Sequence, residues 1–392
     1  MFGKISFNKS VLFCTALAAV PLGIASAVAA APAYTLTGLT IAPGDASSAT
    51  GININGEVVG EAVSASGYQY ATSYNGGAVR SLATSGGGGS YFAAAVNDSG
   101  QIAGQSDIAR NLIQALLWTS SGVTDLGTLG GTNSWAAGIN NSGQVVGAAE
   151  TNNIHGFFYA FLWTASAGMQ NLGGLGGSGG GSYGTAINSV GEVVGGAAPA
   201  GTSPYPHAFL WTSAGGMQDL GTFGGDSSYA YSINTSGEVV GEAATATDQN
   251  SNAFLWVKGG TGGPAGNPQM QDLGTLGGSF SAAYGINDHG AVVGGSMVSA
   301  AGSAQHAFIW TSSGGMQDLN ALIPSGTGWT LTVASGINAD GDIVGYGTNP
   351  SGGTEAFLLT PVPEPAALAL FALGFAGLAL KRRKRSESRP AA

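Results

Sequence analysis

The sequence predicts an all-β protein, a seven-bladed β-propeller built from seven repeats of about 47 residues. Three observations predict it. Glycine makes up 69 of the 392 residues while charged residues make up only 8%. One nine-residue motif recurs seven times, and each apolar run within a repeat is too short for a helix. Short apolar runs bounded by glycine are typical of strands and turns, and the lack of a Gly-X-Y period excludes collagen.

The first element, residues 1–33, is expected to be a secretory signal peptide. Lys4 and Lys9 precede a mostly apolar stretch at residues 11–28, and small residues follow it. This order of basic, apolar and small residues is typical of a cleaved export signal. The single cysteine, Cys14, lies inside this segment. The exported chain is therefore expected to contain no disulfide and no cysteine metal site.

The body, residues 34–361, repeats the motif Ile-Asn-x-x-Gly-x-Val-Val-Gly at intervals of 43 to 53 residues. A period in this range indicates a repeat architecture. Asparagine at the first position of a type I turn accepts a backbone hydrogen bond, and glycine at the fourth position takes the left-handed conformation. The motif therefore predicts a hairpin between two strands. Its asparagines are Asn53, Asn97, Asn140, Asn188, Asn234, Asn287 and Asn338.

Two further motifs, Ala-Phe-Leu-Trp-Thr and Met-Gln-Asp-Leu-Gly-Thr-Leu-Gly-Gly, stay in phase with the asparagine motif. In the first repeat Thr72 is assigned to the tryptophan position, and in the last repeat Leu359 is. Each repeat then holds four short strands, the size of one propeller blade. Phe and Trp point to one side of their strand and Leu to the other, so both faces need a neighbour. The alternative is an open β-solenoid, which requires capping repeats that the sequence does not show.

The triplet His-Ala-Phe stands at residues 207–209 and 306–308. With this triplet, the repeats resemble the HAF family of bacterial extracellular repeats. Together with the Asp-Leu-Gly-Thr-Leu-Gly-Gly and Ile-Asn motifs, the triplet extends the resemblance over about residues 34–360. The family implies an extracellular location and carries no established activity, so the resemblance brings no catalytic residue, cofactor or metal.

The C-terminal segment has three parts in order. Val362, Pro363, Glu364 and Pro365 form a rigid extended motif, and a 15-residue apolar run follows at residues 366–380. The run ends in five consecutive basic residues, Lys381, Arg382, Arg383, Lys384 and Arg385. A 15-residue helix is about 22 Å long, which predicts a short single transmembrane helix with its basic end in the cytoplasm.

Residues 362–385 resemble the PEP-CTERM sorting signal of Gram-negative bacteria, and residues 386–392 would form a cytoplasmic tail. The resemblance implies transient anchoring in the inner membrane and recognition by an exosortase. It also implies cleavage near the motif and release to the cell surface or extracellular matrix. The signal is an address and implies no activity for the body.

The charge of the body excludes one class of partner. Residues 34–360 hold three basic residues, Arg80, Arg110 and Lys258, against 19 acidic ones, which leaves a net charge near −16. Nucleic-acid binding needs a positively charged surface, so this class of partner is excluded.

The sequence offers few candidate site residues. Its four histidines are scattered over different repeats: His155, His207, His289 and His306. We therefore predict no catalytic, cofactor-binding or metal-binding residues. Three recurrent carboxylates are expected on solvated strand edges: Glu57, Glu192 and Glu238.

The expected function is that of an exported, non-enzymatic binding or structural module of the cell surface or biofilm matrix. In an antiparallel blade, the loops after Met-Gln-Asp-Leu-Gly-Thr-Leu and after Glu-Val-Val-Gly share one face, and loops on a rigid scaffold often carry function. Four aromatic residues in or beside these loops are candidates for contact with a polysaccharide or a matrix protein: Trp135, Phe158, Tyr205 and Tyr229. The alternative is a polysaccharide-active enzyme that uses Asp226 or Asp288 in one central pocket.

Overall fold

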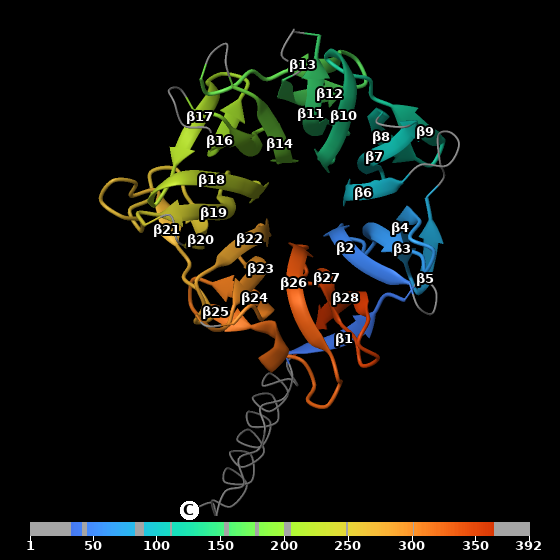
Figure 1. The fold of residues 1–392 in the computed structure, drawn as a ribbon, viewed down its shortest axis with the longest axis vertical. Coiled ribbons are helices and arrows are strands. Elements are labelled where there is room, and N and C mark those ends of the chain that lie inside the picture. Colours follow the sequence, from blue (N-terminus) through green and yellow to red (C-terminus); the bar gives the residue numbers. More distant parts are fainter. Residues whose placement is uncertain are drawn as a thin grey trace, which may run out of the picture. The chain divides into compact units, whose positions relative to one another are not determined.

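The computed structural model describes residues 33–40, 45–82, 90–109, 112–152, 157–176, 180–199, 205–247, 250–300 and 302–363. Within these residues the chain forms seven four-stranded antiparallel sheets arranged around a central axis (Figure 1). The seven-bladed propeller predicted from the repeats is therefore confirmed. The signal peptide and the C-terminal apolar run lie outside the described residues. No helix among the described residues is long and apolar enough to cross a membrane.

Each blade begins at the central axis, and its later strands lie progressively further out (Figure 1). The inner strands are β2 (Ala46–Ile52), β6 (Tyr91–Val96), β10 (Gly130–Ile139), β14 (Ser182–Ile187), β18 (Gly224–Ile233), β22 (Ser281–Ile286) and β26 (Thr330–Ile337). The second strands are β3 (Val58–Val63), β7 (Ile102–Ala109), β11 (Val145–Thr151), β15 (Val193–Ala197), β19 (Val239–Thr245), β23 (Val292–Met297) and β27 (Ile343–Thr348). We number the blades 1 to 7 in this order.

The third strands carry the Ala-Phe-Leu-Trp motif: β4 (Gln69–Asn75), β8 (Leu112–Thr119), β12 (Phe158–Thr164), β16 (His207–Thr212), β20 (Ser251–Trp256), β24 (Gln305–Thr311) and β28 (Thr354–Pro361). The outer strands are β5 (Ala78–Ser81), β9 (Gly122–Asp125), β13 (Gly168–Asn171), β17 (Gly216–Gly221), β21 (Met270–Asp272), β25 (Gly315–Asp318) and β1 (Tyr34–Gly38). A short 3-10 helix, η1 (Leu319–Ala321), follows β25.

Blade 7 joins the two ends of the chain. Its first three strands, β26, β27 and β28, come from the C-terminal end of the body, and its outer strand is the N-terminal β1. Tyr34 pairs with Pro361 and Gly38 with Phe357 in this sheet. The N-terminal strand therefore closes the ring, which keeps blade 7 from having an unpaired third strand.

The packing of the third strands follows the alternation seen in the sequence. Phe161 in blade 3 packs with Ala103 and Leu117 of blade 2. Its neighbour Leu162 packs with Ile187 and Val193 of blade 4. Adjacent residues thus point to opposite sides of the sheet and are buried against different blades, as the sequence predicts.

A buried serine on the inner strand links each of several blades to the blade before it. Ser134 of blade 3 accepts a hydrogen bond from the Ala115 N–H at 3.0 Å and donates one to the Gly127 carbonyl at 2.6 Å, both in blade 2. The same pair of bonds recurs at Ser182, Ser228 and Ser281. The alanine before Phe and the glycine after Asp-Leu in the motifs therefore supply main-chain partners for the next blade.

One assignment from the sequence is wrong by two residues. Val145 of blade 3 pairs with Trp163, and the equivalent Val58 of blade 1 pairs with Tyr74. Thr72, which the sequence assigned to the tryptophan position, pairs with Gly60 and occupies the phenylalanine position. The first repeat has neither the Phe nor the Trp of the motif, and Tyr74 takes the tryptophan position. Leu359 does occupy the tryptophan position of the last repeat, opposite Ile343.

Candidate functional site

The central channel is where residues from all seven blades meet. At one end of it lie the seven turns between inner and second strands; we call this end of the propeller the turn face. The side-chain oxygen of Asn53 accepts hydrogen bonds from the N–H groups of Asn55 and Glu57, and Gly56 has a φ of +74°. Such a positive φ favours glycine. The turn chemistry predicted from Asn-x-x-Gly is therefore confirmed.

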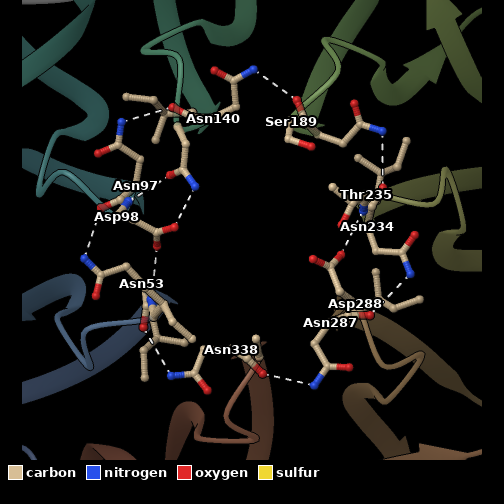
Figure 2. A pocket seen from close by; sticks show the side chains of 18 of the residues that line it. Asn53, Asn97, Asp98, Asn140, Ser189, Asn234, Thr235, Asn287, Asp288 and Asn338 are labelled. Carbon is tan, nitrogen blue, oxygen red and sulfur yellow. Dashed lines mark hydrogen bonds between the residues drawn. The ribbon is translucent and has the colours of Figure 1, made fainter.

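The same asparagines do more than shape their own turns. Each side-chain amide donates a hydrogen bond of 3.0–3.3 Å to the main-chain carbonyl of the next turn asparagine around the channel. The bond from Asn338 to Asn53 completes the circle (Figure 2). All seven asparagines are buried, with exposed fractions of 3–7%. The motif therefore specifies a closed ring of bonds between blades, which inspection of one repeat does not reveal.

The ring surrounds a cavity of about 360 Å³ at the turn face. Two carboxylates lie on its rim, Asp98 and Asp288 (Figure 2). Asp98 accepts a hydrogen bond from the Ile54 N–H at 3.2 Å, and Asp288 accepts one from the Thr235 N–H at 2.9 Å. Both acids thus tie neighbouring turns together.

A second cavity, of about 210 Å³, lies further along the channel. The two cavities share a ring of aliphatic residues that immediately precede the turn asparagines: Ile52, Val96, Ile139, Ile187, Ile233, Ile286 and Ile337. Each inner strand has a register shift just before this ring, and the extra residue lines the second cavity. These bulge residues are Thr50, Ala94, Ala137, Thr185, Tyr231, Tyr284 and Ser335.

The bulge residues divide by side chain. Thr50, Thr185 and Ser335 donate hydrogen bonds of 2.6–2.8 Å to a main-chain carbonyl of the next inner strand around the ring. Tyr231 and Tyr284 occupy the same level and also line the second cavity. The equivalence of the repeats is therefore broken on blades 5 and 6.

A carboxylate lies behind these tyrosines. The Tyr231 hydroxyl donates a hydrogen bond of 2.9 Å to Glu242 Oε1, and Glu242 Oε2 is buried with no hydrogen-bond partner among the described residues. Tyr229 stacks on Tyr231 with ring centroids 6.4 Å apart and planes at 6°. Tyr284 meets Tyr231 at 5.1 Å and 47°. We call Tyr183, Tyr229, Tyr231, Tyr284 and Glu242 the tyrosine cluster.

The electrostatics of the tyrosine cluster follow from its burial. Burial raises the pKa of Glu242, and the hydrogen bond from Tyr231 offsets only part of that rise. Burial also raises the pKa of Tyr284 to about 12, and the negative charge of Glu242 adds to this effect. The pKa of Tyr183 is raised by burial first, and then by Tyr229 and Glu242. The cluster is therefore a partly desolvated acid surrounded by phenols that stay protonated.

Glu242→Gln is expected to stabilise the protein at pH 7–8, because the amide stays neutral where the buried carboxylate is ionised. Folding raises the pKa of Glu242, so ionisation works against folding once the pH passes the ordinary glutamate value. At pH 4 both side chains are neutral and the difference should vanish. The groups facing Glu242 are the four cluster tyrosines, which do not titrate in this range.

The measurement is the thermal midpoint of wild type and variant between pH 4 and pH 8. Glu61 occupies the equivalent position in blade 1, where its two oxygens accept hydrogen bonds from Ser48 and Gln69. Glu61→Gln is the matched control and should give no stabilisation that grows with pH. A Glu242→Gln protein that is less stable than wild type at pH 8 would contradict the argument.

The four candidate aromatics do not form one site. Trp135 and Phe158 belong to blade 3, with ring centroids 4.7 Å apart at 40°, and both are half-buried. Tyr229 lies in blade 5 and belongs to the tyrosine cluster. Tyr205 is 52% exposed and precedes β16 in blade 4. Their part in ligand binding stays a prediction.

The expected loop face is confirmed by the strand order. The connections between second and third strands, and those between one blade and the next, lie at the end of the propeller opposite the turn face. We call this end the loop face. Asp226 lies near the start of β18, towards the loop face, whereas Asp288 lies on the rim of the turn face. The channel therefore does not bring these two acids into one pocket.

Two of the histidines make contacts within their own blades. His207 Nδ1 lies 2.8 Å from Asp219 Oδ2, and His306 makes the same contact with Asp318 at 2.6 Å. The hydrogen bond with Asp219 raises the pKa of His207. Among the described residues, no three His, Cys, Asp or Glu side chains gather as a metal site; His155 lies outside these residues.

Of the three recurrent glutamates expected on solvated strand edges, Glu57 is buried, which is a correction, whereas Glu192 and Glu238 are half-buried. Glu57 is 6% exposed and accepts a hydrogen bond of 2.7 Å from Ser73. Glu192 and Glu238 accept hydrogen bonds of 2.7 and 2.6 Å from the turn asparagines of their own blades. Glu192 and Glu238 therefore hold the asparagine amides of their own blades in place, a role that their spacing of four residues after the asparagine indicates.

Comparison with known proteins identifies the C-terminal segment. Residues 361–384 match the PEP-CTERM protein-sorting motif, which implies exosortase-sorted export to the cell surface. Within the motif, the Val362 N–H donates a hydrogen bond of 2.9 Å to the Ala33 carbonyl. The motif residues Glu364, Pro365 and those of the basic block at 381–385 lie outside the described residues. No match was found among curated protein sequences.

Several solved structures resemble the body. TolB from Acinetobacter baumannii has 12% identity and a TM-score of 0.44, covering 74% of this chain and 65% of its own. A variant of AofleA from Arthrobotrys oligospora has 12% identity and a TM-score of 0.40, covering 69% and 84%. A gluconolactonase from Xanthomonas campestris has 12% identity and a TM-score of 0.38, covering 71% and 90%. The propeller assignment rests on the strand pairing, and no function is carried over.

Proposed function

We propose that the chain is an exported, non-enzymatic module that binds extracellular polysaccharide of the surface matrix through its loop face. The observation that carries this proposal is the placement of the exposed aromatic side chains. Tyr68 and Tyr205 are 41% and 52% exposed, and both lie in connections between second and third strands, on the loop face. The other exposed large hydrophobics among the described residues are the aliphatic Ile54 and Val190, both in turns of the turn face.

Exposed tyrosines suit contact with a sugar. An aromatic ring offers an apolar face, and its hydroxyl remains able to hydrogen bond. Tyr68 stacks on Tyr70 with centroids 6.4 Å apart, and the Tyr70 hydroxyl donates a hydrogen bond of 2.6 Å to Asp45. The Tyr68 ring is therefore held by a neighbouring ring that is itself fixed. This reduces the side-chain entropy that Tyr68 loses on binding.

The position of the two chain ends also supports the loop face as the binding surface. The third strand of a blade runs towards the turn face, and a Cβ on the turn residue Gly341 would lie 3.3 Å from the side chain of Pro361. Tyr34 pairs with Pro361, so the described chain leaves the propeller at the turn face at both ends. A membrane anchor beyond the sorting motif would then hold the turn face towards the membrane and leave the loop face open to the matrix.

The test is binding of the secreted protein to polysaccharide purified from the producing cell's own matrix. Removing two stacking tyrosines at about 0.5–1.5 kcal/mol each should weaken binding by about tenfold in the double variant Tyr68→Ala/Tyr205→Ala. The double variant Ile54→Ala/Val190→Ala, altered only on the turn face, is the control and should bind like wild type.

Three outcomes separate the alternatives. Loss of binding in the loop-face variant alone supports the proposal. No polysaccharide binding by wild type favours a structural role or a protein partner in the matrix. Release of reducing ends from the polysaccharide would favour the other candidate function, a polysaccharide-active enzyme, and overturn the non-enzymatic part of the proposal.

A further inference from the structure

The second channel cavity has two unlike walls. Blades 5 and 6 contribute Tyr231 and Tyr284 at the bulge positions, and blades 2 and 3 contribute Ala94 and Ala137 at the same positions. These two pairs of blades lie across the channel from one another (Figure 1). The aromatic wall therefore faces a wall of small side chains, and the space between them, part of a cavity of about 210 Å³, suits a single sugar ring better than a chain.

The aromatic wall carries negative potential. The face of a tyrosine ring attracts cations through its quadrupole. The Tyr231 hydroxyl donates to Glu242 Oε1 at 2.9 Å, and a hydrogen bond to a carboxylate polarises the donor and makes its ring more electron-rich. Tyr284 meets Tyr231 at 47°, so the two rings form a corner between residues that both line the cavity. The second oxygen of Glu242 has no hydrogen-bond partner among the described residues.

The body as a whole adds to this field. Its net charge is near −16, and a narrow channel with low-dielectric walls concentrates the potential of such a charge distribution. Asp98 and Asp288 stand at the turn-face mouth of the channel. A small cation is therefore drawn towards the channel, and an anion is repelled from it.

We propose that the corner formed by Tyr231 and Tyr284, with Glu242 behind it, binds the protonated amine of an amino sugar. The ammonium group lies against the two rings, and the Glu242 carboxylate behind Tyr231 balances its charge without direct contact. The sugar ring occupies the cavity between the tyrosines and the two alanines. The inference goes beyond the proposed function and rests on it only for the source of the sugar, a matrix glycan or its fragments. The site uses neither of the exposed loop-face tyrosines.

The test uses glucosamine as the probe, titrated into the secreted protein near neutral pH by calorimetry or NMR. N-acetylglucosamine has the same ring without the charge and should bind at least tenfold more weakly. Ethylamine has the charge without the ring and should also bind more weakly than glucosamine. Glu242→Gln should weaken glucosamine binding at least tenfold, and Tyr284→Leu should weaken it as well.

Controls keep this site distinct from the loop face. Glu192→Gln removes a carboxylate in a turn of blade 4 and should bind glucosamine like wild type. The variant Tyr68→Ala/Tyr205→Ala should also bind glucosamine normally even where it loses polysaccharide. Equal binding of glucosamine and N-acetylglucosamine, no glucosamine binding, or unchanged binding in Glu242→Gln would each overturn the inference. Glucosamine binding without polysaccharide binding would uphold this site and overturn only the loop-face proposal.

Discussion

Deletion of residues 34–38 is expected to leave the exported protein without a cooperative folded state at physiological temperature. β1 is the outer strand of blade 7 and pairs with β28. Tyr34 is 9% exposed and belongs to the core cluster that contains Leu319 and Phe357. Burial of Tyr34 contributes about 1.5–3 kcal/mol, and the half-buried Leu36 adds less. The deletion also exposes the edge of β28. The total loss in the free energy of unfolding then approaches the stability of a whole domain, about 5–15 kcal/mol.

The measurement is thermal unfolding followed by circular dichroism, together with resistance to protease. Thr37→Ala alters an exposed β1 position and should change stability by less than about 0.5 kcal/mol. Tyr34→Ala keeps the strand and loses only its buried side chain, so its midpoint should fall between those of wild type and the deletion. A deletion protein that melts like wild type would show that the ring closes without β1.

The number of blades and the number of strands per blade were predictable, because every repeat has apolar residues on both sides of the same strand. Phe161 and Leu162 are adjacent yet buried in different inter-blade clusters. An isolated sheet with one wet face would not keep apolar residues at both positions. The two-sided pattern therefore excludes a simple open sheet and favours blades that touch neighbours on both sides. The hairpin at each asparagine follows from local turn chemistry alone.

The closure and the asparagine ring were not predictable from one repeat. Which strand lies innermost depends on how all repeats pack together, and the repeat motif reads the same whichever strand begins the blade. The bond from Asn338 to Asn53 joins residues at opposite ends of the body, so no local pattern contains it. The one available signal was that asparagine stays at all seven positions, although aspartate or serine also suits the first position of such a turn.

The tyrosine cluster was missed although its signal was present. Three positions before each turn asparagine, the inner strands have small residues except for Tyr231 and Tyr284. After the Val-Val-Gly of blade 5 it has Glu242, where blades 4 and 6 have Gly196 and Gly295. An alignment of the repeats by position, instead of by motif, would have shown these substitutions together. The sequence could not show that they meet at one wall of the channel, because that depends on the bulge.

Gly147→Ala is expected to destabilise the protein by at least about 3 kcal/mol, at the upper end of the cost of overpacking a core. A Cβ at this position would lie 1.9 Å from the carbonyl oxygen of Trp135 and 2.9 Å from the Cα of Ala136. Both are main-chain atoms of the paired inner strand, so they can move only if the inner strand separates from β11. The glycine in Val-Val-Gly is therefore required by close approach at the bulge.

The thermal midpoint should fall by about 6 °C or more, at roughly 2–4 °C per kcal/mol for a large domain. Gly266→Ala is the matched control, because a Cβ there meets no atom within 4 Å and its φ is not positive. It should leave the midpoint within about 2 °C of wild type. The same close approach recurs at Gly195 and Gly241, each 1.9 Å from an inner-strand carbonyl, so Gly195→Ala should reproduce the loss. If Gly147→Ala has the same thermal midpoint as the control, the inner strand accommodates the added methyl group. Close approach would then not explain the glycine of the motif.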